Sequence, residues 1–319
     1  MGPSDNSGHA ESAGTDSCGW VDVATTDMKI AILGNPQSWY VRTLTDAATR
    51  GGHAAEAFDF CRLSSAILEP RTRTSQSGTS LDSSDAVLVR TMPPGSLEQV
   101  VFRMDVLHRC EAQGLLVVNP PRAIECAVDK YLASARMAAA GLPTPRTIVC
   151  ETTEDAMRAF EHLGRDVVVK PLFGAEGRGI VRVSDEELAW RVCTALERTR
   201  SVLYIQEFLE HDGSDRRLVV LGDRVLGAME RRNPNDFRTN ISRKATASSV
   251  DASVEECDLA LSAARAVGAC FAGVDLLRDQ QGRWHVIEVN GVPGWRAFER
   301  VTRIPVADEL IRYLERQLT

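Results

Sequence analysis

The sequence predicts a mixed α/β protein, and three patterns support this fold class. Apolar strand segments alternate with helical segments over residues 28–119, which indicates a parallel sheet with crossover helices. A second α/β unit follows over residues 120–209. In residues 210–319 the strand segments are joined by short turns, so we expect antiparallel pairing there. Residues 1–27 are rich in Ser, Gly, Asp and Thr and are expected to form a disordered tail.

The composition suits a cytoplasmic globular protein of two or three domains. Of the 319 residues, 44% are hydrophobic and 25% are charged, which allows several apolar cores. A net charge of −7 gives the whole molecule no bias toward nucleic acid. The eight cysteines are scattered without a CxxC pair, as expected for reduced thiols. No segment approaches the ~20 consecutive apolar residues of a membrane span, so no membrane partner is expected.

The first unit is predicted from alternating strand and helix signals. KIAILG is an apolar run of strand length, and the helix after it ends at the pair Gly51 and Gly52. The segment near residues 71–84 is rich in Ser and Thr and is expected to be a loop, and Pro120 with Pro121 marks the end of the unit. The expected elements are strands at 29–34, 54–60, 86–90 and 115–119 and helices at 40–50 and 96–113.

The remaining units follow from the same signals. A helix at 129–140 is stopped by Gly141 and by the prolines after it. The other expected elements of the second unit are strands at 147–150, 166–171, 179–183 and 203–209 and helices at 154–163 and 185–199. In the third unit we expect strands at 216–222 and 224–232, an irregular segment, a helix at 254–268, a hairpin at 273–290 and a terminal helix.

The segment VVVKPLFGAEGRGI, residues 167–180, combines a strand-end lysine with a glycine-rich loop. Lys170 ends the apolar strand, and Gly174, Gly177 and Gly179 follow it. Glycines at this density permit backbone conformations in which N–H groups converge on an anion such as phosphate. The spacing fits neither the P-loop nor the dinucleotide fingerprint, so a phosphate site here would be of another type. A flexible hairpin with a solvated lysine is the alternative.

Two further segments carry polar groups suited to a nucleotide. In YIQEFLE, residues 204–210, an edge strand could offer backbone groups to an adenine ring while Glu207 accepts from an amine or a ribose hydroxyl. Its alternative is an ordinary amphipathic strand. The irregular segment 231–245 carries guanidinium groups, which bind phosphate and carboxylate oxygens in pairs; its alternative is a solvated basic loop. The cations of that segment are Arg231, Arg232, Arg238, Arg243 and Lys244.

The predicted hairpin places oxygen ligands together. Period-two alternation puts Trp284, Val286, Glu288 and Asn290 on one face of its second strand, and a turn near residue 281 places Asp275 opposite Glu288. Like charges directly opposed are destabilising, and a divalent cation would offset that repulsion. We therefore expect magnesium at this face, where no Lys or Arg is expected. The alternative is that arginines pair with the carboxylates.

Together these segments resemble the ATP-grasp superfamily and, within it, the RimK-like carboxylate–amine ligases that attach glutamate to an acidic acceptor. The strongest motifs are NDFRTNISR, AGVDLLR and VIEVNGVPGW, preceded by DK, by VVVKP with its glycine loop and by QEF. The resemblance covers nearly all of residues 28–319. It implies an ATP-grasp fold with a Rossmann-like pre-ATP-grasp domain at 28–119, a central subdomain at 120–209 and a C-terminal subdomain with the metal site at 210–319.

The resemblance also implies roles for individual residues. Glu207 and Phe208 would line the adenine slot, and Asp215 would hold the ribose, although the loop before Asp215 is one residue shorter than in the ribosome-modifying members. Arg238 and Asn240 would be catalytic. The implied nucleotide-binding set is Lys130, Lys170, Gly174, Gly177, Gly179, Gln206, Glu207, Phe208, Asp215, Arg238, Thr239 and Asn240. The implied ligands of two magnesium ions, replaceable by manganese, are Asp275, Glu288 and Asn290.

The implied reaction is ATP-dependent amide formation through an acyl phosphate. L-glutamate would join a carboxylate-bearing acceptor, such as a tetrahydromethanopterin-type or furan-type one-carbon cofactor, and the enzyme would be a homo-oligomer. A ribosomal or other protein C-terminus is the alternative acceptor, and a non-catalytic ATP-binding regulatory module is the alternative function. An oxidoreductase is disfavoured because no glycine fingerprint follows KIAILG. Many relatives have NASPG where this chain has NGVPGW, so Trp295 is expected either to stack on a planar substrate ring or to pack against the final helix.

Overall fold

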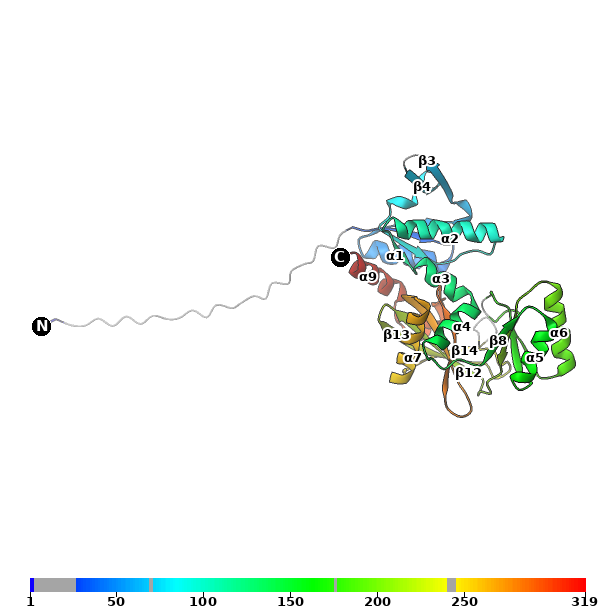
Figure 1. The fold of residues 1–319 in the computed structure, drawn as a ribbon. Helices are drawn as coiled ribbons and strands as arrows, with labels where there is room; N and C mark the ends of the chain where they lie inside the picture. The colour runs from blue at the N-terminus through cyan, green and yellow to red at the C-terminus, as the bar shows by residue number, and fades with distance from the viewer. Residues whose placement is uncertain (3–26, 69–70, 175–176, 240–244) are drawn as a thin grey trace.

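The computed structural model describes residues 1–2, 27–68, 71–174, 177–239 and 245–319. Within these ranges the chain forms three successive units, each built on its own sheet, and a small further sheet is attached to the first unit (Figure 1). No helix in the described ranges is long and apolar enough to cross a membrane. The cysteines in these ranges are all free thiols. Most of the predicted tail lies outside them.

The first unit contains the predicted parallel sheet. Its strands lie in the order β2-β1-β6-β7, and each neighbouring pair is parallel. Ser38 begins the first helix by accepting a hydrogen bond from the Val41 N–H group. The elements are β1 (Lys29–Leu33), α1 (Trp39–Arg50), β2 (Ala54–Phe58), β6 (Ala86–Val89), α2 (Leu97–Ala112) and β7 (Leu116–Val118).

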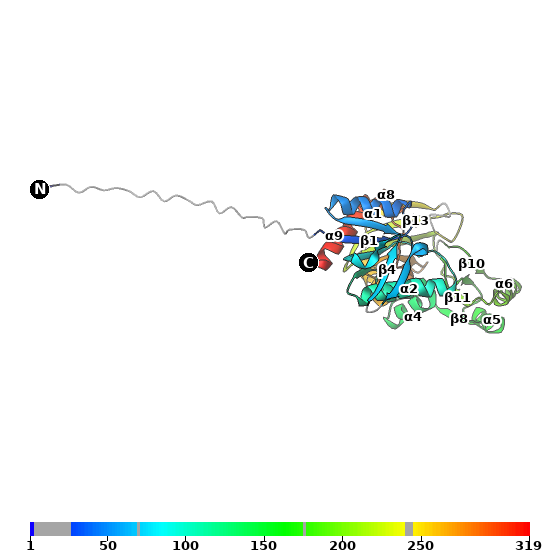
Figure 2. The same ribbon diagram turned by 90° about the horizontal axis from the view of Figure 1, so that it is seen from above.

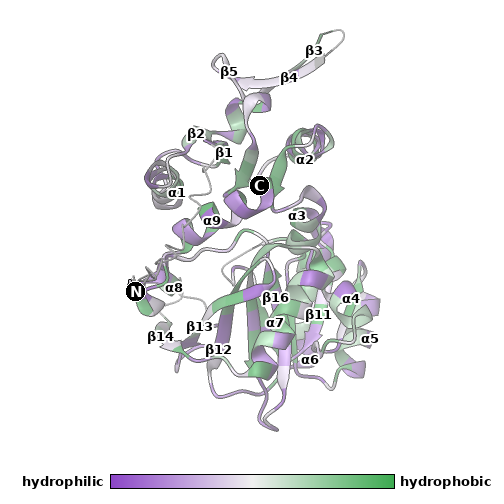
Figure 3. Cartoon of the chain, turned by 90° about the vertical axis from the view of Figure 1, so that its left-hand side faces the viewer, coloured by the Kyte–Doolittle hydropathy of each residue, from purple (hydrophilic) through white to green (hydrophobic). Residues whose placement is uncertain are grey.

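The prediction of a loop near residues 71–84 is wrong. This region forms most of a small antiparallel sheet, which extends away from the parallel sheet (Figure 3). Its strands lack an apolar alternation and are held by polar contacts instead. Thr74 is fully buried, its N–H group donates to Asp82 at 2.7 Å, and its hydroxyl accepts from Arg109 of α2 at 2.5 Å. The elements are η1 (Phe60–Arg62), β3 (Ser64–Leu68), β4 (Arg71–Gln76), β5 (Thr79–Ser80) and η2 (Leu81–Ser83).

Two helices connect the first and second units. The sequence predicted α4 (Lys130–Ala139) but not α3 (Pro121–Val128), because Pro120 and Pro121 suggested a boundary. Proline is tolerated in the first turn of a helix, where its missing N–H group would have no partner. Both helices pack on the core of the C-terminal sheet, together with α7.

The second unit has a core of its own. Its antiparallel sheet has the order β10-β9-β11-β8, and α5 and α6 pack on it at one end of the molecule (Figures 1 and 2). The predicted edge strand at 204–210 is wrong, since β11 lies between β9 and β8 and is bonded on both sides. The elements are β8 (Thr147–Cys150), α5 (Thr153–His162), β9 (Val167–Lys170), β10 (Val181–Val183), α6 (Glu186–Arg198) and β11 (Leu203–Glu207).

The third unit is a five-stranded antiparallel sheet, as expected, in the order β14-β13-β12-β15-β16. One face carries α7, and the other packs in part against the first unit and lines in part a pocket beside the second unit. Strand β14 was not predicted. The elements are β12 (Ser214–Leu221), β13 (Arg224–Arg232), β14 (Thr246–Val250), α7 (Val254–Val267), β15 (Phe271–Arg278), β16 (Trp284–Asn290), α8 (Arg296–Thr302) and α9 (Val306–Leu318).

The first and third units share a continuous apolar core. Ile30 and Leu44 of the first unit belong to the same buried cluster as Phe271, Trp295 and Phe298 of the third. Helix α9 also packs against α1. The buried core of the second unit, in contrast, contains only residues between 156 and 205.

A β-bulge changes the predicted faces of the hairpin. Asp275 pairs with Glu288, as expected, but the register shifts so that the next residue of β15 pairs with Val286. Ile287 is the extra residue, and the period-two alternation therefore breaks at it. Val286 faces the core under α7, whereas Glu288 lies on the opposite face with Asp275. The prediction that Trp284 and Val286 share a face with Glu288 and Asn290 is wrong for this reason.

Candidate active site

A pocket lies between the sheets of the second and third units. Strands β9 and β11 supply one side of it, and β12, β15 and β16 supply the other. Gly174, Gly179 and Asn290 lie outside its lining, and Asn240 lies outside the described residues. The predicted site residues that line it are Lys130, Lys170, Gly177, Gln206, Glu207, Phe208, Asp215, Arg238, Thr239, Asp275 and Glu288.

Lys170 is held at the end of β9 by a chain of neutral hydrogen-bonding groups. Its Nζ donates to the Gln206 side-chain oxygen at 2.6 Å. The Gln206 amide nitrogen donates in turn to the Thr147 hydroxyl at 2.9 Å and to Tyr204 at 3.3 Å, and the Tyr204 hydroxyl lies 2.8 Å from that of Ser134. Burial lowers the pKa of Lys170 to about 8, although Glu288 counteracts the shift. No local pattern in the sequence points to the hydroxyl groups of Thr147, Tyr204 and Ser134 in this hydrogen-bond network.

Lys130 contacts the glycine-rich loop. Its Nζ donates to the Gly174 carbonyl at 2.9 Å, and burial lowers its pKa. Gly174, Gly177 and Gly179 have φ angles of 142°, 69° and 73°, which side-chain-bearing residues rarely adopt. These backbone conformations explain why the three positions are glycine. We name Lys130, Lys170 and Gln206 the lysine side of the pocket.

Glu207 and Phe208 lie at the rim near the junction of the second and third units. The Glu207 carboxylate accepts from the Arg146 side chain at 2.6 Å and from its backbone N–H group at 2.8 Å. The carboxylate thus forms a salt bridge with Arg146, and its predicted contact with an amine or a hydroxyl of the nucleotide stays a prediction. Phe208 packs against Phe237, with ring centroids 5.8 Å apart, and the guanidinium carbon of Arg182 lies 3.5 Å from the centre of its ring.

The other side of the pocket is a buried network of ion pairs. Arg217 donates to both oxygens of Asp275, at 2.7 and 2.6 Å, and Arg231 lies 3.1 Å from the same carboxylate. Arg231 also binds both oxygens of Asp215, and the Thr239 hydroxyl donates to Asp215 at 2.5 Å. We name these five residues the paired side of the pocket.

The expectation that no Lys or Arg lies on the face of Asp275 is therefore wrong. Burial alone would raise the pKa of Asp275, but Arg217 and Arg231 outweigh it and lower the pKa. Burial likewise opposes the charge of Arg231, yet Asp215 and Asp275 raise its pKa. Alternation along SDRRLVV places Asp215 and Arg217 on one face of β12, so this pattern could have placed an arginine on the face of Asp215 from the sequence.

The residues proposed as metal ligands fit a magnesium ion in their chemistry. A carboxylate has about four lone-pair positions, and the three guanidinium contacts of Asp275 leave one of them on Oδ1. Glu288 lies directly opposite on β16 and lines the pocket. The Asn290 amide nitrogen donates to the Gly273 carbonyl at 3.2 Å, which directs its bonding through nitrogen and leaves the amide oxygen for another partner. Hard oxygen ligands of this kind suit magnesium. Among His, Cys, Asp and Glu alone, the described ranges contain no group of three that could hold a metal, and the proposed set includes the Asn290 amide oxygen besides the two carboxylates.

The predicted basic cluster is divided by the structure. Arg231 and Arg232 lie in β13, while Arg238 follows that strand. The Arg238 side chain bonds Asp236, with Nη2 to Oδ2 at 2.7 Å, and donates through Nη1 to the Ile180 carbonyl at 3.0 Å. This contact joins the segment after β13 to the end of the glycine-rich loop. Arg243 and Lys244 lie outside the described residues.

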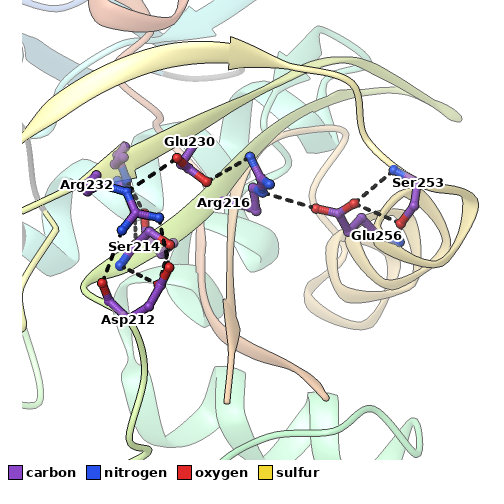
Figure 4. Close-up of polar contacts among 9 residues, drawn as sticks. Asp212, Ser214, Arg216, Glu230, Arg232, Ser253 and Glu256 are labelled. Atoms are coloured by element: carbon purple, nitrogen blue, oxygen red, sulfur yellow. Dashed lines mark hydrogen bonds and ion pairs between the residues drawn. The ribbon is translucent and has the colours of Figure 1, made fainter. Parts of the chain in front are cut away.

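A second polar network lies on the opposite face of the same strands (Figure 4). Arg216 pairs with Glu230 at 3.2 Å and with Glu256 of α7 at 3.5 Å. Arg232 pairs with Asp212 at 2.8 Å, in the loop where the chain passes from the second unit to the third. Glu256 also accepts from the backbone of the helix cap Ser253 (Figure 4). This network fixes the crossing loop to α7.

Trp295 packs inside the protein, as one of its two predicted alternatives stated. It is fully buried, 4.9 Å from the Tyr40 ring and 5.6 Å from the Phe271 ring between centroids. A substrate ring therefore cannot stack on it in this structure.

Two sheets that enclose a pocket, with lysines on one side and carboxylates on the other, define an ATP-grasp protein. Two family models match the chain: a RimK PreATP-grasp domain over residues 28–124 and a RimK-like ATP-grasp domain over residues 127–314. The chain belongs to the RimK-like ATP-grasp family.

Relatives of similar length support this assignment. The tetrahydromethanopterin:alpha-L-glutamate ligase of Methanosarcina acetivorans is 33% identical, over 90% of this chain and 98% of its own. A probable alpha-L-glutamate ligase of Trichodesmium erythraeum is 32% identical, over 91% of this chain and 97% of its own. The predicted family and the predicted ligase activity, which forms carbon–nitrogen bonds, are confirmed.

Solved structures show the same fold. The ATP-grasp ligase PsnB, complexed with a minimal precursor, has a TM-score of 0.75 at 24% identity and covers 92% of this chain and 100% of its own. The same ligase with precursor, Mg and ADP has a TM-score of 0.71 at 23% identity, with coverage of 91% and 98%. The predicted ATP-grasp fold with its N-terminal domain is confirmed. ATP and magnesium are the cofactors that ATP-grasp ligases use.

Proposed function

We propose that this chain joins L-glutamate to a carboxylate-bearing small molecule, with hydrolysis of ATP to ADP and phosphate. The observation that carries the proposal is the asymmetry of the pocket, where the lysine side faces carboxylates across a gap between two units. The named activities of the two relatives support glutamate as the amino acid. A tetrahydromethanopterin-type cofactor is the acceptor class that the Methanosarcina relative favours.

The proposed reaction has two steps. An acceptor carboxylate oxygen attacks the γ-phosphorus of ATP, and the bond to the ADP oxygen breaks. The glutamate amine then attacks the acyl carbon, phosphate leaves with the electrons of the carbon–oxygen bond, and the amine proton passes to solvent. Because both steps move negative charge, positioned cations supply most of the acceleration. Lys130 and Lys170 are proposed to hold the phosphates, with Arg238 and Asn240 at the reacting groups.

Magnesium is proposed to bind at Asp275, Glu288 and Asn290, with two ions as the expected number. When bound, it would neutralise phosphate charge and orient the oxygens for transfer. The arginine contacts of Asp275 keep that carboxylate ionised and limit its rotation, as outer contacts of a metal ligand do. Asp215 is proposed to hold the ribose, and Arg231 fixes its orientation. Thr239, which donates to Asp215, is proposed to face the phosphates and the acceptor.

The test is ADP release with ATP, Mg²⁺, L-glutamate and candidate acceptors, followed by mass spectrometry for a glutamyl addition. We expect ADP release that depends on glutamate and on one acceptor class. A screen of cell extract with each amino acid identifies the acceptor and the donor together. ATP binding without ADP release under every condition would support the regulatory alternative. Addition of glutamate to a protein terminus alone would support the alternative acceptor.

The proposal includes a homo-oligomer in the cytoplasm, where ATP and glutamate are available. In this proposal, exposed apolar side chains on the first unit form part of the interface between subunits, where association would remove them from water. They are Ile67 and Leu68 on β3 and Leu97, Val101 and Phe102 on α2. Light scattering of the purified protein measures the mass of the assembly.

A further inference from the structure

Two polar residues directly follow adjacent strands of the first unit. Arg90 follows β6, and Asn119 follows β7. These strands pair in parallel, so their carboxyl ends lie at the same edge of the sheet. Arg90 is 4% exposed and Asn119 is 1% exposed. Both side chains reach into the third unit.

Arg90 contacts the loop 291–294, which follows β16. Its Nη2 donates to the Pro293 carbonyl at 3.0 Å. Its guanidinium carbon lies 4.2 Å from the centre of the Trp295 ring and 4.9 Å from that of Tyr40. Nε and Nη1 have no hydrogen-bond partner within the described part of the chain. Burial lowers the pKa of Arg90 to about 10, and among the described residues it is the hydroxyl of Tyr40, not a carboxylate, that opposes this shift.

Asn119 joins both strands that carry the proposed metal ligands. Its amide nitrogen donates to the Phe271 carbonyl at 2.6 Å and to the Gly291 carbonyl. Its amide oxygen accepts from the N–H groups of Cys270 and Phe271, each at 2.8 Å. Phe271 begins β15, and Gly291 directly follows Asn290. One side chain thus fixes the start of one strand relative to the end of the other.

The loop has little room to move away from these contacts. A Cβ atom added at Gly294 would lie 2.9 Å from the Tyr40 hydroxyl oxygen, and one added at Gly291 would lie 3.0 Å from the Ala127 Cβ. The first unit therefore contacts the loop at several points. Since a buried arginine with unpaired N–H groups is unfavourable for stability, its presence here calls for a role other than stability.

We propose that Arg90 and Asn119 are positioning residues that hold loop 291–294 and, through it, place Asn290 for magnesium. This inference rests on the proposed function, because it takes Asn290 as a ligand. It gives the first unit a part in the reaction although that unit lines none of the pocket between the sheets. The two residues act by fixing backbone, and neither touches the reacting groups.

The test compares Arg90→Met with Arg103→Met in the full chain. Arg103 is a matched control, since it is also 4% exposed and donates to a proline carbonyl, Pro93, but within the first unit. Hydrogen exchange of a peptide that spans Gly291–Trp295 is the first measurement. We expect faster exchange there in Arg90→Met and in Asn119→Ala, and an unchanged rate in Arg103→Met.

The second measurement is the Mg²⁺ concentration for half-maximal ADP release. We expect it to rise about tenfold in Arg90→Met, as for loss of an outer contact to a metal site, with little change in the KM for ATP. Equal exchange in the two arginine variants would overturn the inference, as would an unchanged Mg²⁺ requirement in Arg90→Met. A raised KM for one carboxylate substrate with unchanged exchange would instead make Arg90 a ligand of that substrate.

Two further arms keep the outcome interpretable. If Arg90→Met does not fold, Arg90→Lys retains charge and one donor, and a smaller effect in the same direction is expected. If the unaltered chain releases no ADP with any acceptor, the proposed function fails, yet the exchange measurement still tests the contact with the loop. The two failures are therefore distinguishable.

Discussion

The two sides of the pocket handle buried charge in opposite ways. On the lysine side, Lys170 donates its hydrogen bond to a neutral amide, and burial lowers its pKa to about 8 although the Glu288 charge opposes the shift. On the paired side, Arg231 contacts two carboxylates and its pKa is raised. A cation without a counter-charge is ready to receive an anion, whereas a compensated one is not. The comparison supports the proposal that the second unit attracts phosphate and that the third holds the metal ligands in fixed positions.

The two sides of the pocket also differ in how they are connected to the rest of the protein. The paired side belongs to a sheet that shares its core with the first unit and carries a second ion-pair network on its other face (Figure 4). Lys170 and Gln206 of the lysine side belong to a unit with a separate core, whereas Lys130 begins α4, which packs on the core of the C-terminal sheet. Relative motion of two units is expected where their cores are separate. The proposed metal ligands would thus lie on the rigid part together with Lys130, while Lys170 lies on the part that can move.

The largest effect should come from removing a carboxylate that the comparison assigns to metal. Glu288→Gln should lower kcat/KM by ~10³-fold, or ~4 kcal/mol, because a proposed metal ligand loses its charge at nearly constant shape. ADP release as a function of Mg²⁺ measures this change. Glu230→Gln is the control, since Glu230 lies on the opposite face of the sheet and should leave the Mg²⁺ dependence unaltered. Near-normal turnover in Glu288→Gln would reject the metal assignment.

Removing a buried cation should have a smaller effect, on the free energy of unfolding, and this effect should differ in direction between the two sides of the pocket. Arg231→Met should lower the free energy of unfolding by about 3 kcal/mol, because Asp215 and Asp275 lose a buried partner. Lys170→Met should leave it unchanged or raise it by ~1 kcal/mol, since a buried charge with one neutral partner is removed. Urea denaturation followed by circular dichroism compares the two. Equal losses would mean that the two sides do not differ as described.

The residues of both sides could be found from the sequence, but their partners could not. Lys170 and its glycines stand out because positive φ angles and a strand-end cation are local properties. The opposition of Asp275 and Glu288 also follows from a short hairpin. The pairing of Arg217 and Arg231 with Asp275 depends instead on the order of β13, β12 and β15, which the hairpin does not determine.

The errors in the fold have the same origin. The β-bulge inserts Ile287 into β16 as an extra residue without a partner on β15. The residue types of WHVIEVN do not indicate that the alternation breaks there. The strands near residues 71–84 are stabilised by Arg109 and Asp82 rather than by an apolar pattern. Strand β11 is an inner strand because β8, from residues about 55 positions earlier in the chain, pairs beside it. Each feature depends on a distant segment, so local periodicity could not predict it.

The smallest expected effect is on the pH dependence of ATP binding, which should come from the lysine side of the pocket. As pH rises above the pKa of Lys170, about 8, the free protein loses this charge, and the dissociation constant for ATP should increase by up to about tenfold per pH unit. The paired side should contribute nothing in this range, because the pKa of Asp275 is lowered and that of Arg231 is raised. Calorimetric titration with ATP between pH 7 and 10 measures the profile.

Gln206→Glu sharpens this prediction because it places a carboxylate 2.6 Å from where the Lys170 ammonium lies. The new charge should raise the pKa of Lys170, so affinity for ATP should persist to higher pH, while added repulsion weakens binding at neutral pH. The hydroxyls of Thr147 and Tyr204 can turn to donate to the new oxygen, which keeps the buried group bonded. Lys170→Met should bind ATP weakly with no such alkaline decline. If Lys170→Met kept the decline of the unaltered chain, another group such as Lys130, whose pKa burial also lowers, would be titrating, and Lys170 would not be the receiver of phosphate.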